Sequence, residues 1–464
     1  MPLRSTIWKI LVVVLFLLSA VLALSARSED PEIVFHSDQR DTLKPPWVRP
    51  SHVIKMDHAY SGQWLVAGDL DGDEQVEFLS ARNDEQVITA MSAYKLDGRV
   101  LWRWGRPSSG SALFGYDVPA QIYDVDGNGS REVIFSVQGF LVFAEGATGR
   151  EIWRMPLPEN LRVADCIVFA NLTGRKRAED LIIKDRYERI WAFERDSRTQ
   201  AGNPFYRRLL WRIETPGGFK TCHHPERVDI DGDGRDEVMV GYALADDDGD
   251  ILWTLQSARA DLQRGHLDCC RLVRRGKRPE GFRFVLTYCG AKAVAVVDGT
   301  GRTLWELTSH HFESADVGDV RPDIAGPEIV VDIDHQPYGN SPTWILSEDG
   351  RLLGTYLTNY GRHHDLVDWN GDGIDEIIFG HARALCDGRG QRLATFAPDS
   401  SDLILTPEGS GDPEPFVLVG DVTGDGREDV ILHSAEQIEI YANPSPQPPR
   451  HPVRIGSGLN FTLY

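Results

Sequence analysis

Short apolar runs alternate with acidic loops along most of this chain. An apolar run such as Trp64 to Gly68 leads into an acidic loop, and a second run such as Glu132 to Phe135 leaves one. Two further runs follow, separated by a tight turn such as Asp97-Gly98. Asp-Gly between alternating apolar residues is a strong signal for a β-hairpin. The pattern therefore predicts repeated units of four short strands.

The acidic loops recur at a nearly constant interval. Five complete loops begin at residues 69, 124, 229, 368 and 421, and two degraded loops run from Asn171 to Glu179 and from Asp319 to Glu328. Residues 266–309 supply one more unit, without an acidic loop. A period near 50 residues is typical of a propeller or a solenoid. We therefore predict an all-β protein, a single β-propeller of eight four-stranded blades, whose terminal segments complete a shared blade and close the ring.

The complete loops place oxygen-bearing side chains at positions 1, 3, 5 and 9. In the loop that begins at Asp229, Gly232 and Gly234 permit the tight turn that brings these side chains together. Hard cations such as Ca²⁺ take six to eight oxygen ligands. We expect several Ca²⁺ ions, held by Asp69, Asp71, Asp73 and Glu77; Asp124, Asp126, Asn128 and Glu132; Asp229, Asp231, Asp233 and Glu237; Asp368, Asn370, Asp372 and Glu376; and Asp421, Thr423, Asp425 and Asp429.

A tryptophan recurs in the last strand of several units. We interpret it as packing between neighbouring blades rather than as a platform for a ligand, because large aromatic side chains at one register bury much area. The residues concerned are Trp102, Trp153, Trp211, Trp253 and Trp305.

The N-terminal segment predicts export. Residues 1–26 combine basic residues with an apolar core of about 15 residues, too short for a spanning helix of roughly 20. We expect a signal peptide, or an uncleaved anchor as the alternative, and a secreted or periplasmic protein that touches a membrane only if the segment is retained. Residues 27–50 are predicted to form a linker or an arm on the domain, and residues 51–464 the propeller.

Composition agrees with an exported globular protein. The formal net charge of −21 lies largely in the loops and gives no basic patch for nucleic acid. The six cysteines permit disulfides, although buried free thiols suit a chain of this size equally well. We expect a monomer.

Histidines gather at the openings of the units, a few residues before the acidic loops. In a closed ring these positions converge on one rim of the predicted central channel, where histidines serve hydrogen bonding, metal binding or proton transfer. Adjacent histidines on one strand point to opposite faces, so each pair offers one side chain to the rim. Our candidates for catalysis are His224, His311, His364, Tyr242 and Arg383.

Such a rim suits an acidic polysaccharide. Arginine pairs with a uronate carboxylate, and histidine or tyrosine can abstract the proton α to it while the neutralised carboxylate stabilises the enolate-like state. This is β-elimination. A hydrolase is less favoured, because it needs two carboxylates that flank a bond, and the acidic pairs that we find belong to the cation loops.

The chain resembles a known family at several segments. The Asp-x-Asp-Gly-Asp-Gly-x-x-Glu loops are similar to those of FG-GAP type calcium-binding propellers. The block from His223 to Leu252, the block from Glu313 to Glu328, and the end from Gly458 to Tyr464 resemble rhamnogalacturonan lyases of polysaccharide lyase family 11. The resemblance implies an eight-bladed, calcium-dependent propeller that cleaves the rhamnose–galacturonate backbone of pectin. The chain departs from that pattern at His310-His311-Phe312-Glu313, where the family usually has a Gly-His-Gly-Asp type sequence.

Two other functions are compatible with these patterns. The first is a non-catalytic FG-GAP repeat protein whose calcium loops stiffen a surface that binds carbohydrate or protein. The second is a quinoprotein-like propeller, suggested by the Asp-Gly-x-x-Leu-Trp hairpins, although no residue demands a redox cofactor.

Overall fold

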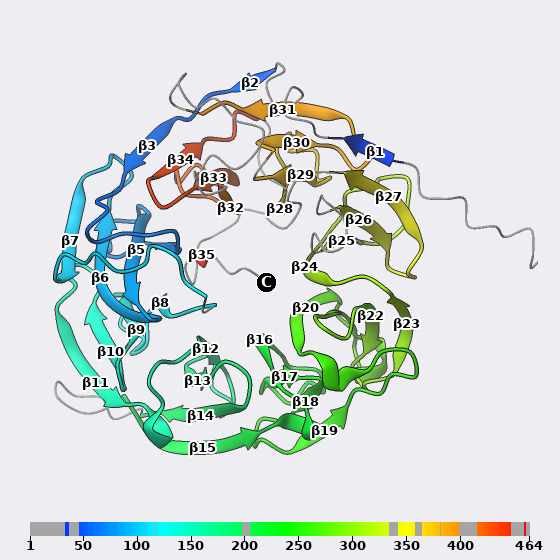
Figure 1. Cartoon of the computed structure of the whole chain (residues 1–464), viewed down its shortest axis with the longest axis horizontal. Coiled ribbons are helices and arrows are strands. Elements are labelled where there is room, and N and C mark those ends of the chain that lie inside the picture. Colours follow the sequence, from blue (N-terminus) through cyan, green and yellow to red (C-terminus); the bar gives the residue numbers. More distant parts are fainter. Residues whose placement is uncertain are drawn as a thin grey trace, which may run out of the picture.

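Eight β-sheets surround a common axis and form a closed ring (Figure 1). The computed structural model describes residues 33–36, 46–115, 117–196, 205–333, 342–357, 364–380, 382–398, 415–446 and 459–460. The predicted signal segment and residues 461–464 lie outside the described residues. The prediction of an all-β propeller with eight four-stranded blades is confirmed.

The first four blades along the chain each run from the axis outward in sequence order. Their strands are β4 (Leu65–Gly68), β5 (Glu77–Asp84), β6 (Val87–Tyr94) and β7 (Val100–Gly105); β8 (Ala120–Tyr123), β9 (Glu132–Val137), β10 (Phe140–Glu145) and β11 (Glu151–Pro156); β12 (Cys166–Ala170), β13 (Asp180–Lys184), β14 (Arg189–Arg195) and β15 (Tyr206–Glu214); β16 (Thr221–Val228), β17 (Glu237–Gly241), β18 (Ala243–Ala245) and β19 (Ile251–Thr254).

The next four blades follow the same order. Their strands are β20 (Leu267–Arg274), β21 (Arg283–Tyr288), β22 (Ala293–Asp298) and β23 (Thr303–Thr308); β24 (Phe312–Gly318), β25 (Glu328–Ile333), β26 (Thr343–Ser347) and β27 (Leu352–Leu357); β28 (His364–Val367), β29 (Glu376–Phe379), β30 (Ala384–Cys386) and β31 (Arg392–Phe396); β32 (Phe416–Gly420), β33 (Asp429–His433) and β34 (Gln437–Tyr441). The blade β20–β23 is the predicted unit without an acidic loop.

Terminal segments close the ring. The eighth blade takes its outermost strand from the N-terminal side, where β3 (His52–Lys55) pairs antiparallel with β34. Two further N-terminal strands, β1 (Ile33–His36) and β2 (Trp47–Val48), pair parallel with the outer strands β27 and β31. At the axis, β35 (Leu459–Asn460) pairs with β4. This arrangement confirms the expected closure and covers three sheet edges.

The predicted tryptophans pack between blades. The indole Nε1 of Trp102 donates to the carbonyl oxygen of Gly146 in the next blade at 2.7 Å. Trp211, Trp253 and Trp305 donate to the equivalent hairpins of their neighbours. Gly149, at φ +67°, leaves room for the Trp102 ring, since a Cβ there would lie 2.6 Å from a ring carbon. Packing therefore accounts for the aromatic hairpins that suggested a quinoprotein.

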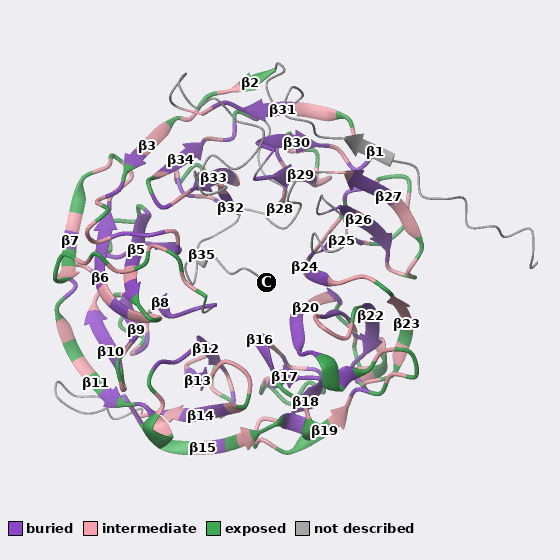
Figure 2. Cartoon of the chain, viewed as in Figure 1, coloured by how far each residue is buried: buried purple, intermediate pink, exposed green. Residues whose placement is uncertain are grey.

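The middle strands of each blade are buried, and the outer strands are the most exposed (Figure 2). Short 3₁₀ helices lie in connections at Pro158–Asn160, Pro216–Gly218, Leu262–Arg264 and Pro279–Gly281. Among the residues that the structure describes, no helix has the length and apolar character to cross a bilayer.

Candidate active site

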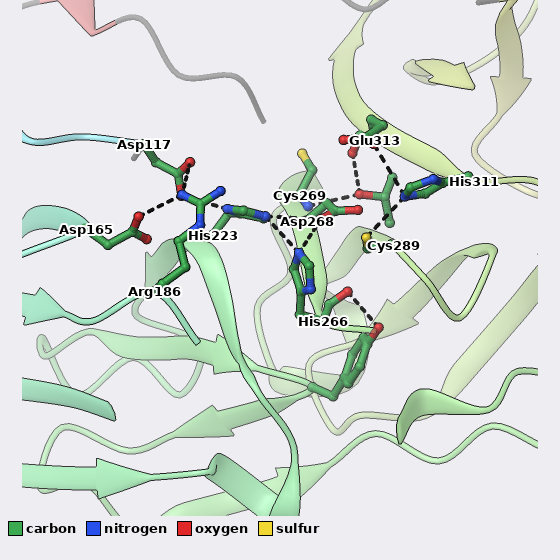
Figure 3. Close-up of polar contacts among 12 residues, drawn as sticks. Asp117, Asp165, Arg186, His223, His266, Asp268, Cys269, Cys289, His311 and Glu313 are labelled. Atoms are coloured by element: carbon green, nitrogen blue, oxygen red, sulfur yellow. Dashed lines mark hydrogen bonds and ion pairs between the residues drawn. The ribbon is translucent and has the colours of Figure 1, made fainter. Parts of the chain in front are cut away.

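Polar side chains from five consecutive blades meet where the inner strands begin (Figure 3). Each blade supplies one to three residues, either just before its inner strand, early in that strand, or from the connection between its second and third strands. This inner-strand cluster consists of Asp117, Asp165, Arg186, His223, His266, Asp268, Cys289, His311 and Glu313. It confirms that strand openings of separate repeats converge.

Two histidines and one aspartate form the first half of the cluster. The Nε2 atoms of His223 and His266 lie 2.8 Å apart. Oδ1 of Asp268 lies 3.0 Å from Nε2 of His266 and 3.4 Å from Nε2 of His223. Desolvation, and then the nearby His223, lower the pKa of His266 to about 2, so its imidazole is neutral. These three buried side chains offer two nitrogens and an oxygen to one point.

Buried ion pairs hold His223 in place. Its Nδ1 lies 2.8 Å from Oδ2 of Asp117, which leaves Nε2 directed toward His266. Nη1 of Arg186 lies 2.7 Å from Oδ1 of Asp165 and 3.3 Å from Oδ1 of Asp117. The ammonium of Lys184, fully buried, lies 2.5 Å from Oδ2 of Asp165. A carboxylate on the far nitrogen of a histidine fixes its tautomer and orientation, as it does around metal sites.

The second half of the cluster contains a thiol. Nε2 of His311 lies 3.1 Å from Sγ of Cys289 and 3.4 Å from Oε1 of Glu313. Ligand atoms of Asp268, Cys289 and His311 all lie within 4.8 Å of one another, so Asp268 faces both halves. Desolvation, and then Asp268, raise the pKa of Cys289 to about 12. All six cysteines are free, and Cys289 alone among them is not fully buried.

Tyr187 and Lys220 border the cluster on the side that reaches solvent. The Tyr187 ring contacts the rings of His266 and His223, with centroids 4.6 and 5.7 Å away. The Lys220 ammonium lies 5.1 Å from the centre of the Tyr187 ring. Lys220 is exposed and Tyr187 is half-buried. These are polar groups that a polysaccharide can reach beside the buried histidines.

The predicted histidines occupy three different settings. His311 belongs to the cluster. His224 does not: its neighbour His223 takes the place we predicted for it, and desolvation lowers the pKa of the half-buried His224 to about 3. His364 is buried, with Nε2 3.2 Å from the Val330 carbonyl oxygen and 3.3 Å from Oδ2 of Asp316.

Tyr242 and Arg383 do not lie on the predicted rim. Tyr242 is fully buried, and its hydroxyl donates to the carbonyl oxygen of His266 at 2.7 Å. Burial raises its pKa, so it supports His266 rather than accepting a proton. Arg383 forms a buried ion pair between blades, with Nη2 2.7 Å from Oε2 of Glu439. The loop that follows the second strand turns both side chains inward against the neighbouring blade.

The carboxylates and the thiol of the cluster were missed. The acidic pairs that we found from sequence lie in the cation loops and did not include Asp117, Asp165, Asp268 and Glu313, which lie at the opposite ends of the inner strands. The position rule that selected the histidines would also have selected Asp165 and Asp268. Nothing in the spacing indicates Cys289.

The acidic loops connect the first and second strands of seven blades and share one hydrogen bond. The carboxylate that opens the second strand accepts from the backbone N–H one residue into the loop, as Glu237 does from Ile230 at 2.7 Å. The same bond is made by Glu77, Glu132, Asp180, Glu328, Glu376 and Asp429. In the degraded loop after Asn171, this position belongs to Asp180 rather than to the predicted Glu179.

The loops suit a hard cation, whereas the inner-strand cluster does not. In the second blade, ligand oxygens of Asp124, Asp126 and Glu132 lie within 4.8 Å of one another. Desolvation, and then the two aspartates, raise the pKa of Glu132 to about 8. Oxygen-only sets of this kind match Ca²⁺. Imidazole and thiol groups are ligands for softer ions.

The first blade fills its loop with a side chain. Nζ of Lys95 lies 2.6 Å from Oδ2 of Asp71, 2.8 Å from Oδ2 of Asp73 and 3.0 Å from Oε1 of Glu77. Lys95 begins the turn between the third and fourth strands, where the fourth blade has Asp246 instead. An ammonium therefore lies among the carboxylates that we predicted as calcium ligands.

A family model for the C-terminal domain of rhamnogalacturonan lyase family 11 matches residues 218–453, just over half of the chain. The chain belongs to this family. The matched region contains His223, His266, Asp268, Cys289 and His311, whereas Asp117, Asp165 and Arg186 precede it.

Curated relatives agree with this family assignment. Rhamnogalacturonan endolyase YesW of Bacillus subtilis is 23% identical over 86% of this chain and 72% of its own length. Rhamnogalacturonan exolyase YesX of the same organism is 25% identical over 87% and 75%.

Solved structures share the fold. A family 11 rhamnogalacturonan lyase of Bacillus licheniformis superposes with a TM-score of 0.60, at 18% identity, over 87% of this chain and 76% of that one. The V. cholerae biofilm matrix protein Bap1 reaches 0.57 at 11% identity, over 90% and 93%.

Proposed function

We propose that this protein is a polysaccharide lyase that cleaves a rhamnogalacturonan-type, uronate-containing backbone by β-elimination at the inner-strand cluster. Membership of the family and the names of both curated relatives support this activity. The location of the site rests on the meeting of buried imidazoles and carboxylates with Lys220 and Tyr187, which reach solvent.

Elimination needs three things from the protein. The uronate carboxylate must be neutralised so that the α proton becomes acidic, a base must take that proton, and the leaving oxygen must be stabilised. The exposed Lys220 ammonium is placed to pair with the carboxylate. Arg186 is committed to Asp117 and Asp165, so it fixes the cluster rather than the substrate. A metal ion bound by the histidines would add positive charge next to the substrate carboxylate.

We assign pairing with the substrate carboxylate to Lys220 and proton exchange with the substrate to Tyr187. Both lie beside His266, and both lack the buried partners that occupy Tyr242 and Arg383. Of the residues predicted from sequence, His311 alone lies in the cluster, where it borders the reaction centre through Cys289 and Glu313.

Calcium in the acidic loops, and export, are parts of the same proposal. The loops at Asp124, Asp229, Asp368 and Asp421 contain the oxygen sets that calcium prefers. The basic and apolar residues 1–26 support a secreted or periplasmic location, where plant polysaccharide would be met.

The experiment is an ultraviolet assay for the unsaturated uronate that elimination creates, with rhamnogalacturonan I first and then other uronate polysaccharides. We expect absorbance to rise on rhamnogalacturonan I and the rate to fall at least 100-fold in Lys220→Met and in Tyr187→Phe, the loss that removal of a charge-neutralising or a proton-transfer group typically causes. Lys277→Met is the matched control, because Lys277 is also exposed but lies at the opposite end of the inner strands.

Absence of any rise, with polysaccharide binding still measurable, would contradict the lyase and favour the non-catalytic binding propeller. A normal rate in both variants would leave elimination intact and refute the assigned residues.

A further inference from the structure

We propose that a pocket on the outer flank of the ring, between the fourth and fifth blades, binds a neutral sugar ring of the polysaccharide. The pocket has a volume of about 440 Å³ and is lined by Gln256, Ala258, Arg259, Thr303, Trp305 and Glu306, none of which belongs to the inner-strand cluster. Its volume falls within the range of small-molecule sites, roughly 300–1,000 Å³. The identity of the polymer rests on the proposed function, whereas the pocket itself does not.

A long connection encloses the pocket. Residues 255–266 join β19 to β20 and pack along β23, the outer strand of the fifth blade (Figure 1). The equivalent connection before the fourth blade, residues 215–220, has six residues instead of twelve. It packs tightly on β19, since a Cβ on Gly217 would lie 2.5 Å from Oγ1 of Thr254. The longer connection therefore leaves an open space beside β23 where the neighbouring blade has direct contact.

Trp305 gives the pocket an aromatic wall. Its Nε1 donates to the carbonyl oxygen of Glu348 in the next blade at 2.8 Å, so the polar edge of the indole is occupied by interblade packing. The side chain is nevertheless only half-buried, and its ring borders the pocket. An aromatic ring beside polar side chains fits a pyranose, whose C–H face is apolar and whose rim of hydroxyl groups is polar.

The polar side chains around this ring retain unused hydrogen-bonding capacity. Arg259 is exposed and donates to one backbone oxygen, that of Glu306, at 3.3 Å; it forms no ion pair with any residue that the structure describes. Both carboxylate oxygens of Glu306 accept from Oγ of Ser257, at 2.8 and 3.0 Å, which leaves lone pairs for another donor. Hydroxyl groups both donate and accept, so they match a pocket that offers both functions.

The charges of the pocket favour a neutral sugar over a uronate. Arg259 and Glu306 carry opposite charges that cancel. A uronate carboxylate would gain from the guanidinium but would meet the carboxylate of Glu306, whereas a neutral ring accepts from one group and donates to the other. Rhamnose is the neutral unit of a rhamnose–galacturonate backbone, so it is the ligand that we assign to the pocket.

The pocket and the inner-strand cluster share one connection. Residues 255–266 line the pocket and end at His266 of the cluster. A polymer held at both places binds more tightly than at either one, because the second contact becomes intramolecular. A short oligosaccharide that occupies only the cluster gains nothing from the pocket. The pocket therefore retains the polymer and takes no part in the chemical step.

The first test measures retention of the polymer, so it does not require turnover. In affinity electrophoresis through gels that contain rhamnogalacturonan I, Arg259→Ala should raise the apparent Kd about tenfold, the loss typical of a hydrogen bond to a charged group. Arg264→Ala is the matched control, because Arg264 is exposed on the same connection but pairs with Asp261 and does not line the pocket. On a short rhamnogalacturonan oligosaccharide, kcat and KM of Arg259→Ala should equal those of the wild type.

The outcomes separate the pocket from the lyase proposal. Equal retention of Arg259→Ala and the wild type would overturn the pocket, as would an equal loss in Arg264→Ala. Retention that depends on Arg259 in a protein without turnover would refute the lyase and keep the pocket.

A second test identifies the sugar. Methyl α-rhamnoside and methyl α-galacturonide serve as separate probes in saturation-transfer NMR. The rhamnoside signal should fall at least threefold in Arg259→Ala and in Ala258→Leu, which narrows the pocket, and the galacturonide signal should be the same in all variants. No rhamnoside signal in the wild type, a rhamnoside signal that survives in both variants, or a fall in the galacturonide signal instead would overturn the neutral-sugar site.

Discussion

The two ends of the inner strands carry different kinds of residues: repeated acidic loops that stabilise the blades at one end, and the proposed active site at the other. At one end, seven blades repeat the same carboxylate-to-backbone hydrogen bond in an acidic loop. At the other end, five consecutive blades each contribute a different set of one to three residues to one cluster. A device that stabilises a blade can be copied from blade to blade. A site that binds one asymmetric ligand cannot, because each position faces a different part of that ligand.

Removal of calcium is expected to have the largest effect. An ion that binds only the folded chain at 100 times its Kd adds about 2.7 kcal/mol, and four loops retain complete oxygen sets. EGTA should therefore lower the Tm strongly in differential scanning calorimetry, and added Ca²⁺ should restore it. Mg²⁺ is the control ion. An unchanged melting curve would show that the loops are empty and remove the contrast between the two ends.

Next in size is the loss of a cluster histidine. His266→Gln should reduce turnover at least 100-fold, about 2.7 kcal/mol of transition-state stabilisation, because it removes the imidazole that contacts Tyr187 and Asp268 and so holds the proposed reaction centre in place. The matched variant Asp229→Ala, at the other end of the neighbouring blade, should lower the Tm and keep most of the activity at low temperature. Reversed outcomes for the two variants would refute the division of roles.

A smaller effect is expected for the residue that orients His223. Asp117→Asn keeps the shape of the side chain but removes the negative charge that faces Nδ1 of His223. Loss of an outer partner of this kind typically lowers activity or metal affinity 10- to 100-fold. We expect a fall in kcat with little change in KM. Asp261→Asn, an exposed aspartate, is the control. An unchanged kcat would show that Asp117 serves folding alone.

A substitution of Lys95 tests whether its ammonium takes the place that a cation would occupy in the other acidic loops. Lys95→Met removes the ammonium from three carboxylates, so the Tm should fall by a few degrees without calcium. With calcium the loss should be recovered, because the freed oxygens then match those of the other loops. If calcium does not restore the Tm, the first loop cannot hold an ion even without its lysine.

The smallest effect is expected for His364. Its Nε2 is bonded within the sixth and seventh blades, to Val330 and Asp316, outside the cluster. His364→Gln should keep turnover within threefold of wild type in the ultraviolet assay. A 100-fold loss would restore the original prediction that this histidine is catalytic.

Local pattern was enough to predict the fold. Hairpin turns, the period near 50 residues and the recurring tryptophan each depend on short-range geometry, and the structure confirms eight blades, closure by terminal strands and interblade packing. The loop at Asn171 shows the usual limit: its last carboxylate is Asp180, one residue beyond the predicted Glu179, because strand register decides which side chain faces the loop.

Tertiary structure alone decided which side chains meet. The sequence placed histidines at strand openings, but it could not say that His223 rather than His224 turns toward Asp117, because β16 pairs irregularly between Thr221 and Glu226. It could not connect Cys289 with His311, which belong to different blades and meet only when the ring forms. Local periodicity determines the strands and their order. Contacts between blades depend on the packing of the whole ring, which no short segment encodes.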